Sequence, residues 1–322
     1  MKVLITGGNG FIGSHLVKYF LTKKHHVLNI DKISKFSQKT QISSRKYLFK
    51  KINLLNTRKL KKIFYTFKPS LIIHSAAESH VDRSIKNPSS FFLNNILSTL
   101  NLLDLTKNKK IKFIHISTDE VFGSLKKNEE KFNSKSSYNP RNPYSASKAA
   151  SDHAVRSYGE TFNLNYKIIN CSNNYGPFQH YEKLIPKVIL NCLNRKKIPI
   201  YGNGSNIRDW IFVEDHVRAI YKIATLRTKR KTFLIGGNNQ ISNLSLVKII
   251  CKKIDKVCKT KNSFSLVKFI KDRPGHDFRY EIDNNDTKKE INWFPEKNLN
   301  DGIEETVNFY IKNYKKLNKI FI

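Results

Sequence analysis

The sequence predicts an α/β protein with a doubly wound parallel sheet and a smaller C-terminal domain. Short apolar strands alternate with helical segments over roughly the first 170 residues, a pattern typical of right-handed βαβ units. A glycine-rich turn joins the first strand to the first helix. Beyond about residue 175 the pattern is less regular and richer in loops, so we expect the second domain there, over the carboxyl ends of the strands.

The first half of the sheet follows from apolar runs and helix boundary signals. Residues 2–6 form a mainly apolar strand, and a helix is expected over 11–23, after the glycines. Thr57 can cap a helix N-terminus, so we expect it to begin a helix that runs to Phe67. The other strands of this half are predicted at 27–30, ending at Asp31, and at 71–74.

The second half of the sheet continues the alternation. A long helix is expected over 88–107, and a strand at 112–117 precedes a helix that carries Tyr144. A strand at 166–171 completes the regular pattern. Two domains are therefore predicted, 1–174 with some later segments returning to it and most of 175–322, while 32–46 and 125–139 are expected to be surface loops.

The chain is strongly basic. Its 59 Lys and Arg against 25 Asp and Glu give a formal net charge of +34, which could indicate nucleic-acid binding. The basic runs, such as 59–62, 107–110 and 315–319, are spread over the chain without an interleaved aromatic pattern. We favour an AT-rich coding bias, which the abundant Lys, Asn and Ile also suit, and expect no specific nucleic-acid partner. The charge would still attract anionic substrates.

Composition favours a cytoplasmic globular protein. The mean hydropathy is −0.49, no uncharged apolar run reaches the roughly 18 residues of a membrane span, and the first residues lack a signal-peptide pattern. We therefore expect no membrane partner. No Cys-x2-Cys pair or nearby His gives zinc-ligand spacing, so no metal site is expected. The cysteines expected to be reduced and mostly buried are Cys171, Cys192, Cys251 and Cys258.

The glycine-rich turn predicts a dinucleotide site. Gly7, Gly10 and Gly13 stand between the first strand and the first helix, where the backbone can approach a pyrophosphate and the helix N-terminus offers N–H groups. Asp31 follows Gly13 by 18 positions. Its carboxylate would bind the adenosine ribose and disfavour a 2′-phosphate. The pattern therefore predicts that 1–174 is a Rossmann domain that binds NAD rather than NADP, although Lys32 slightly weakens that preference.

Two short segments carry groups for acid–base chemistry. Tyr144 and Lys148 lie one helical turn apart on the same face, so we expect the ammonium to favour the phenolate and Tyr144 to accept a proton near neutral pH. Asp119 and Glu120 directly follow an apolar strand and could supply an acid and a base. Such a set could oxidise an alcohol, remove a proton from carbon and expel water.

Several further segments carry a family resemblance over nearly the whole chain. They lie in order at 76–84, 117–123, 172–180, 182–186, 201–204, 208–210 and 272–277. Together with the glycine motif and the Tyr144–Lys148 pair, they resemble the dTDP-glucose 4,6-dehydratase family of the extended short-chain dehydrogenase/reductase superfamily. Each segment alone is moderately specific, and the ordered set is highly specific.

The resemblance implies a dehydration, catalysed by a hydro-lyase, with an internal redox cycle. In such a cycle Tyr144 removes the proton of the glucose C4 hydroxyl while hydride passes from C4 to NAD, and Lys148 holds Tyr144 poised. Thr118 hydrogen-bonds the C4 oxygen, Glu120 removes the C5 proton, and Asp119 protonates the departing C6 hydroxyl. Hydride then returns to C6. The product would be a 4-keto-6-deoxy sugar, which could feed rhamnose or other deoxysugars.

The resemblance also implies the binding residues. Contacts with NAD are expected from Gly7, Gly10, Phe11, Ile12, Gly13, Asp31, Asn53, Ala76, Tyr144 and Lys148. Contacts with the nucleotide sugar are expected from His80, Thr118, Asn173, Lys183, Leu184, Arg208, Asn243, Arg273 and His276. Of these, Arg208 and Arg273 would clamp the diphosphate, a task suited to a planar guanidinium.

Three features depart from the family pattern. Asn53 stands where an Asp near the adenine is common, the loop 32–39 lacks the usual sequence, and Phe122 replaces a commoner Tyr. Asn53 can still donate and accept hydrogen bonds, so NAD binding is expected to be weakened rather than lost. None of the three removes a catalytic group.

The resemblance further implies a homodimer. Its interface would be a four-helix bundle made from the Tyr144 helix and the helix around 90–107. The leucines available for the core or for this interface are Leu97, Leu100, Leu103 and Leu105. The large net charge would make association less favourable at low salt.

Three alternatives remain beside the dTDP-glucose reaction. A nucleotide-sugar 4-epimerase would share Tyr144 and Lys148 but needs neither Asp119 nor Glu120. A 4,6-dehydratase of another nucleotide sugar, such as UDP-glucose or GDP-mannose, would keep that pair. A basic RNA-associated binding protein on a decayed enzyme fold is disfavoured, because all the groups for catalysis are retained.

Overall fold

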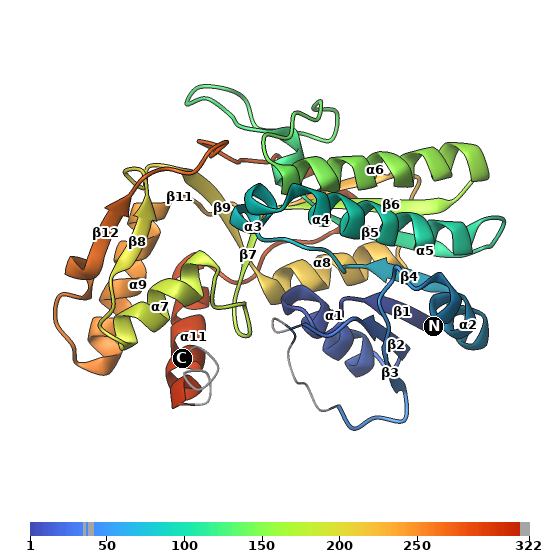
Figure 1. Cartoon of the computed structure of the whole chain (residues 1–322), viewed down its shortest axis with the longest axis horizontal. Coiled ribbons are helices and arrows are strands. Elements are labelled where there is room, and N and C mark those ends of the chain that lie inside the picture. The colour runs from blue at the N-terminus through green and yellow to red at the C-terminus, as the bar shows by residue number, and fades with distance from the viewer. Residues whose placement is uncertain (35–36, 38–41, 316–322) are drawn as a thin grey trace.

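A seven-stranded parallel sheet forms the centre of the computed structural model, which describes residues 1–34, 37 and 42–315 (Figure 1). Its strand order is β10-β6-β5-β4-β1-β2-β3, which confirms the predicted doubly wound sheet. The strands are β1 (Lys2–Thr6), β2 (His26–Asp31), β3 (Tyr47–Lys51), β4 (Leu71–His74), β5 (Lys112–Thr118), β6 (Asn165–Cys171) and β10 (Thr232–Ile235). The chain runs from β1 outward to β3 and then crosses to β4, so the switch point, where such sheets bind ligands, lies between β1 and β4.

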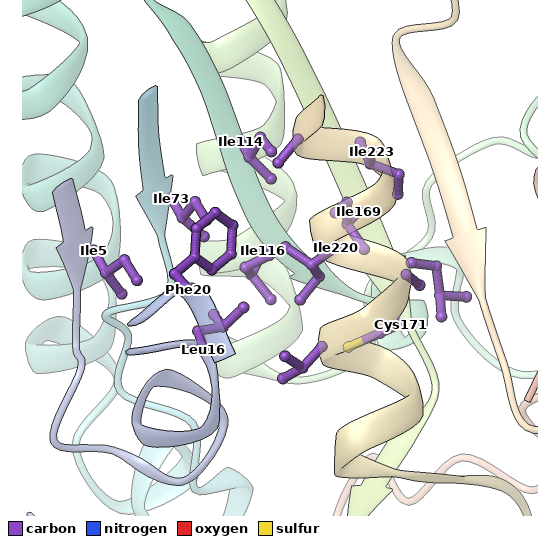
Figure 2. Packing of buried hydrophobic residues seen from close by; sticks show 14 of the residues in the cluster. Ile5, Leu16, Phe20, Ile73, Ile114, Ile116, Ile169, Cys171, Ile220 and Ile223 are labelled. Carbon is purple, nitrogen blue, oxygen red and sulfur yellow. The ribbon is translucent and has the colours of Figure 1, made fainter. Parts of the chain in front are cut away.

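Helices cover both faces of this sheet. On one face, α1 (Phe11–Thr22) and α8 (Val213–Thr225) pack together, and Phe20 and Ile220 meet Ile114 of β5 in one apolar cluster (Figure 2). On the other face lie α2 (Thr57–Phe67), α5 (Ser98–Thr106) and α6 (Pro143–Phe162). Successive strand residues point to opposite faces, because the side-chain period of a strand is two. This explains why β1 and β4, at the centre of the sheet, are mostly apolar on both faces.

A second lobe stands beside the sheet, on the left of Figure 1. It holds a three-stranded sheet of β11 (Gln240–Ser242), β9 (Ile207–Phe212) and β7 (Asn173–Tyr175), and the pair β8 (Ile198–Tyr201) and β12 (Val267–Ile270). Its core is closed by α7 (Leu184–Leu193), α9 (Asn243–Cys258) and α11 (Leu299–Lys312). Between these elements the chain returns to the first lobe, where α8 covers the large sheet and β10 pairs with β6. The division at 174 stays a prediction.

The long helix predicted over 88–107 is interrupted. The structure has α4 (Pro88–Phe92), a π turn (Leu93–Leu97) and then α5. The π turn places Asn95 inside, where its Oδ1 accepts a hydrogen bond from Glu78 N at 2.8 Å and its Nδ2 donates to Glu78 O at 3.1 Å. These bonds to a loop 17 residues away do not show in the periodicity of the helix.

One other local prediction is corrected. Thr57 is the first residue of α2 rather than its cap, because Asn56 Oδ1 accepts the hydrogen bond from Lys59 N. The loop 125–139 is largely exposed, as predicted, and Phe132 anchors it by bridging to Ile282 and packing in a small apolar cluster.

Parts of the region predicted as the loop 32–46 lie outside the described residues. Strand β3, which follows this region, was not predicted, because its three apolar residues are followed by two lysines and the strand is partly exposed at the edge of the sheet. Two further short helices are α3 (Val81–Lys86) and α10 (Asn285–Ile291). Among the described residues, the longest apolar helices still fall short of what a membrane crossing requires.

Candidate active site

The loop between β1 and α1 is a cradle of glycines at the switch point. Gly7 has φ +72°, in the left-handed region, and a Cβ on it would lie 2.7 Å from Ala76 Cα. A Cβ on Gly13 would lie 2.0 Å from Gly7 O. No described side chain caps α1, so the first-turn N–H groups, including those of Phe11 and Ile12, are free for an acceptor. This loop fits the close approach of a pyrophosphate.

Asp31 lies beside this cradle at the end of β2. Its Oδ2 accepts a hydrogen bond from Asn9 N at 3.0 Å, which joins the carboxylate to the glycine loop. Lys32 Nζ lies 2.5 Å from Glu78 Oε1, so its charge is already paired. Asn53 is exposed, and its Oδ1 accepts a hydrogen bond from Leu55 N in the turn before α2.

The end of β5 carries two carboxyl groups in different surroundings. Thr118 caps a 3-10 turn (Asp119–Phe122) by accepting a hydrogen bond from Glu120 N at 3.3 Å. Asp119 is 1% exposed, and its Oδ2 has no hydrogen-bond partner among the described residues. Burial, with the nearby charges of Glu120 and Asp209, raises the pKa of Asp119 well above its usual range. The protonated form of Asp119 is therefore favoured, as a proton donor requires.

Tyr144 and Lys148 reach the same place from α6. A capping box at Asn142 starts this helix, so both side chains come from its first two turns. Lys148 Nζ donates to Ile116 O at 2.8 Å and lies 3.1 Å from His115 Nε2. Burial lowers the pKa of Lys148 to about 8.

The prediction that Lys148 makes Tyr144 a ready phenolate is wrong for this structure. Burial and the nearby charge of Glu120 raise the pKa of Tyr144 well above its usual range, although a hydrogen bond with Thr118 opposes this rise. The sequence showed the helical spacing of the two residues. It could not show that removal of water outweighs the neighbouring cation.

Cations of the second lobe gather near Glu120. Its charge acts on the pKa values of both Lys183 and Arg208. Lys183 directly precedes α7, and its Nζ donates to Ser79 O at 2.7 Å. Arg208 is 5% exposed, donates to the carbonyl oxygen of Asp277 at 2.8 Å, and lies over the ring of Tyr280 at 4.3 Å.

The other predicted substrate contacts surround these cations. Asn173 lies on β7 with a buried Oδ1 that has no partner among the described residues. Arg273 has a similarly unpartnered buried Nε, and its Nη1 lies 3.4 Å from Asp82 Oδ1. His276 Nδ1 lies 2.6 Å from Asp272 Oδ1.

Three predicted contacts lie at element ends. Leu184 begins α7 and Asn243 begins α9. His80 precedes α3, and its Nε2 is 3.3 Å from Glu182 Oε2. Burial lowers the pKa of His80 to about 4, so the ring is neutral at neutral pH.

Sequence reasoning missed two groups that shape this site. Tyr280 is 1% exposed, packs on Arg208, and hydrogen-bonds Asp277. Glu182 forms an ion pair with Arg83, and its Oε2 also lies 3.3 Å from Nε2 of the neutral His80 ring. Glu182 stands in a family-like segment, which was a usable signal, whereas no pattern around Tyr280 relates it to Arg208.

We predict a pH-dependent stability difference between the native protein and the Asp119→Asn variant. Because folding raises the pKa of Asp119, the stability contributed by its protonated form is present below the unfolded pKa of about 3.9 and is lost as pH rises through the folded pKa. Because Asp119→Asn has no such group, its stability relative to the native protein should rise as pH increases from about 5 to about 7. Urea unfolding at both pH values measures this.

The matched control for this experiment is Asp286→Asn, at a side chain that is 70% exposed. Its stability relative to the native protein should change little over the same pH interval. A constant difference between native protein and Asp119→Asn would show that Asp119 is already ionised when folded.

Comparisons with known proteins agree with this architecture. A family model described as GDP-mannose 4,6 dehydratase matches residues 4–306. A probable dTDP-glucose 4,6-dehydratase of Sinorhizobium fredii is 42% identical over 97% of this chain and 93% of the relative. A dTDP-glucose 4,6-dehydratase of Escherichia coli is 41% identical over 97% of this chain and 94% of the relative.

A solved structure shows the same fold. The dTDP-glucose 4,6-dehydratase DesIV of Streptomyces venezuelae, solved with NAD bound, superposes with a TM-score of 0.92. It is 33% identical, with 99% of this chain and 100% of the other covered. These matches extend from β1 to α11 and so include both lobes. The chain therefore belongs to the nucleotide-sugar 4,6-dehydratase family, together with the dTDP-glucose 4,6-dehydratases.

Proposed function

We propose that this protein is a dTDP-glucose 4,6-dehydratase, an NAD-dependent hydro-lyase that forms dTDP-4-keto-6-deoxyglucose. The observation that carries this proposal is the arrangement at the end of β5, where Asp119, whose protonated form is favoured by burial, and its neighbour Glu120 lie beside Tyr144. Oxidation of an alcohol requires only the Tyr144 side of this arrangement. Elimination of water also requires an acid and a base on different atoms, which the two carboxyl groups supply.

The glycine cradle is the place for the cofactor. Gly7, Gly10 and Gly13 leave no room for side chains, and the uncapped start of α1 offers donors to a pyrophosphate. Asp31 would bind the adenosine ribose, and the pairing of Lys32 with Glu78 removes a cation that could attract a 2′-phosphate. NAD bound there would accept a hydride from C4 of the sugar and return it to C6.

The protein groups divide the proton transfers among themselves. Tyr144 takes the proton of the C4 hydroxyl, with Thr118 as the hydrogen-bond partner of the C4 oxygen. The C4 ketone then acidifies the C5 proton, which Glu120 removes, and Asp119 gives its proton to the departing C6 hydroxyl. The burial that keeps Asp119 protonated prepares it for this step. A positively charged nicotinamide ring beside Tyr144 would lower the pKa of its phenol.

The second lobe supplies the contacts for an anionic nucleotide. Arg208, Arg273 and Lys183 lie close enough to influence one another electrostatically, so together they would hold the diphosphate. The unpartnered buried atoms of Asn173 and Arg273 offer hydrogen bonds to the sugar nucleotide. Leu184, Asn243, His80 and His276 would complete the contacts. The Asp119–Glu120 pair argues against a 4-epimerase.

The function is tested by incubating the purified protein with dTDP-glucose and no added nicotinamide. We expect the sugar nucleotide to lose one water while no net NADH absorbance develops, because the hydride is returned within one cycle. UDP-glucose and GDP-mannose, tested in parallel, should turn over much more slowly. Absence of a dehydrated product from all three, even after NAD is added, would refute the proposed function.

Two variants test whether Tyr144 acts in C4 oxidation and Glu120 acts in elimination. Tyr144→Phe should slow C4 oxidation by about 10²–10⁴-fold, because the proton acceptor is lost. Glu120→Gln should still allow C4 oxidation, which appears as NADH absorbance in a single turnover, but should slow elimination and solvent deuterium incorporation at C5. Tyr314→Phe and Glu304→Gln, whose side chains bond Asn194 and Lys253 elsewhere on the surface, are the matched controls. Equal loss of both half-reactions in Glu120→Gln would contradict the assignment.

We also propose that the protein is a cytoplasmic homodimer. Phe92, Leu93 and Leu97 are 36%, 55% and 41% exposed along α4 and the π turn, next to α6. Leu103, in contrast, is fully buried in the core of the monomer. An exposed apolar row beside a long helix favours burial against a second copy.

All four cysteines are free thiols, which suits a reducing compartment.

Leu93→Lys should convert the dimer to monomer in light scattering. Val257→Lys is the control, because Val257 is 46% exposed on α9, away from α4 and α6. The native dimer should also dissociate more readily at low salt, since the net charge of +34 is then less screened. A native protein that is monomeric at all salt concentrations would refute the dimer.

A further inference from the structure

A buried carboxylate lies one helical turn beyond Lys148 on α6. Asp152 has no exposed surface. Its Oδ2 accepts hydrogen bonds from Ser117 Oγ and from Tyr138 OH, both at 2.8 Å, and from Asn170 Nδ2 at 3.3 Å. The mechanism proposed above does not use this carboxylate. A fully buried charge held by three donors is expensive to maintain, so its surroundings require an explanation.

His115 connects this carboxylate to Lys148. Its Nε2 lies 3.1 Å from Lys148 Nζ and 3.2 Å from Asp152 Oδ1. Its Nδ1 has no hydrogen-bond partner among the described residues. The neutral ring can accept from Lys148 or donate to Asp152 through Nε2, but it cannot do both at once. The position and charge of the lysine therefore influence which of the two partners Nε2 of the ring bonds.

We propose that Asp152, which lies with Lys148 beside Nε2 of His115, is a positioning residue for Lys148 that keeps its ammonium protonated and holds it one turn from Tyr144. The proposal rests on the proposed function, in which Lys148 assists Tyr144. The carboxylate contacts neither substrate nor cofactor and acts only through the lysine.

The groups around Lys148 leave Asp152 as its nearest negative charge. From α6 it faces Tyr144 and Asp152, from β5 His115, from β6 Cys171, and from β4 His74. Burial raises the pKa of Cys171 to about 12 and lowers that of His115 to about 4, so both are neutral at neutral pH. Burial likewise lowers the pKa of His74 and raises that of Tyr144.

Asp152 itself stays ionised despite its burial. Burial alone would raise its pKa, but the close approach of His115 and the hydrogen bond from Ser117, with the charge of Lys148, outweigh that effect and hold the pKa below its usual range. For Lys148 both effects are reversed, because burial lowers its pKa and the charge of Asp152 raises it, and burial has the larger effect. If the charge of Asp152 is removed, Lys148 will lose its proton at a lower pH.

The experiment compares Asp152→Asn with Tyr138→Phe. The first variant removes the charge and keeps the shape, while the second removes one hydrogen bond to the same carboxylate and keeps the charge. Lysine labelled with ¹³C at Cε reports each ammonium by NMR, and Lys148→Met assigns the signal. In the native protein Lys148 should titrate near pH 8, well below surface lysines at about 10.4.

In Asp152→Asn the pKa of Lys148 should fall by about 1 unit or more, whereas in Tyr138→Phe it should stay within about 0.3 unit. The alkaline limb of kcat should move by the same amount, so that kcat near pH 8 falls about fivefold while KM for the sugar nucleotide changes little. Asp152→Glu, which restores the charge, should return the limb toward its native position. Asp152→Ser replaces Asp152→Asn if the latter does not fold.

Two results would overturn the proposal. One is an unchanged Lys148 titration after the charge is removed. The other is an equal loss of kcat at every pH, which a purely structural role would produce. The NMR titration needs no turnover. A native protein without dehydratase activity would therefore refute the proposed function, while the titration would still decide the role of Asp152.

Discussion

Exclusion of water from the carboxyl end of β5 is the constraint on which the site depends. Burial is the largest influence on the pKa of Asp119, of Tyr144 and of Lys148. It keeps the first two protonated and brings the lysine close to neutral pH. The same groups in water would titrate at their ordinary values and would not be prepared for elimination. A dry site also strengthens each charge–charge interaction within it.

The second lobe makes this burial possible and also makes the two adjacent carboxyl groups different. Arg208 and Tyr280 come from segments far along the chain, yet both lie within the electrostatic reach of Glu120. Asp119, one residue earlier, is almost fully buried, whereas Glu120 is only partly buried. Neighbours in sequence can therefore serve as acid and base, because opposite sides of the strand end meet different surroundings.

Several cations that lie partly or fully inside this basic protein donate hydrogen bonds to backbone carbonyl oxygens. With 59 basic and 25 acidic residues, carboxylates are too few to pair with every cation. Lys112 donates to carbonyl oxygens at the C-terminal end of α8. Lys167 donates to carbonyl oxygens of the loop that follows α8. Arg208 donates to the carbonyl oxygen of Asp277, which precedes the segment 279–282. Carbonyls at a helix C-terminus are unpaired and carry partial negative charge, so they stabilise such cations.

The sequence by itself determined the parallel sheet, the glycine cradle and the set of reactive groups at 117–123 and at Tyr144, because these depend on local periodicity and short spacing. Only the tertiary structure decided their protonation and their partners. The π turn at Asn95, the neutral Tyr144 and the charge of Asp152 behind Lys148 arise from contacts between residues far apart in the chain and from the water those contacts exclude. Neither the protonation states nor the partners can be predicted from residue spacing in a single sequence, since both depend on which segments meet in three dimensions.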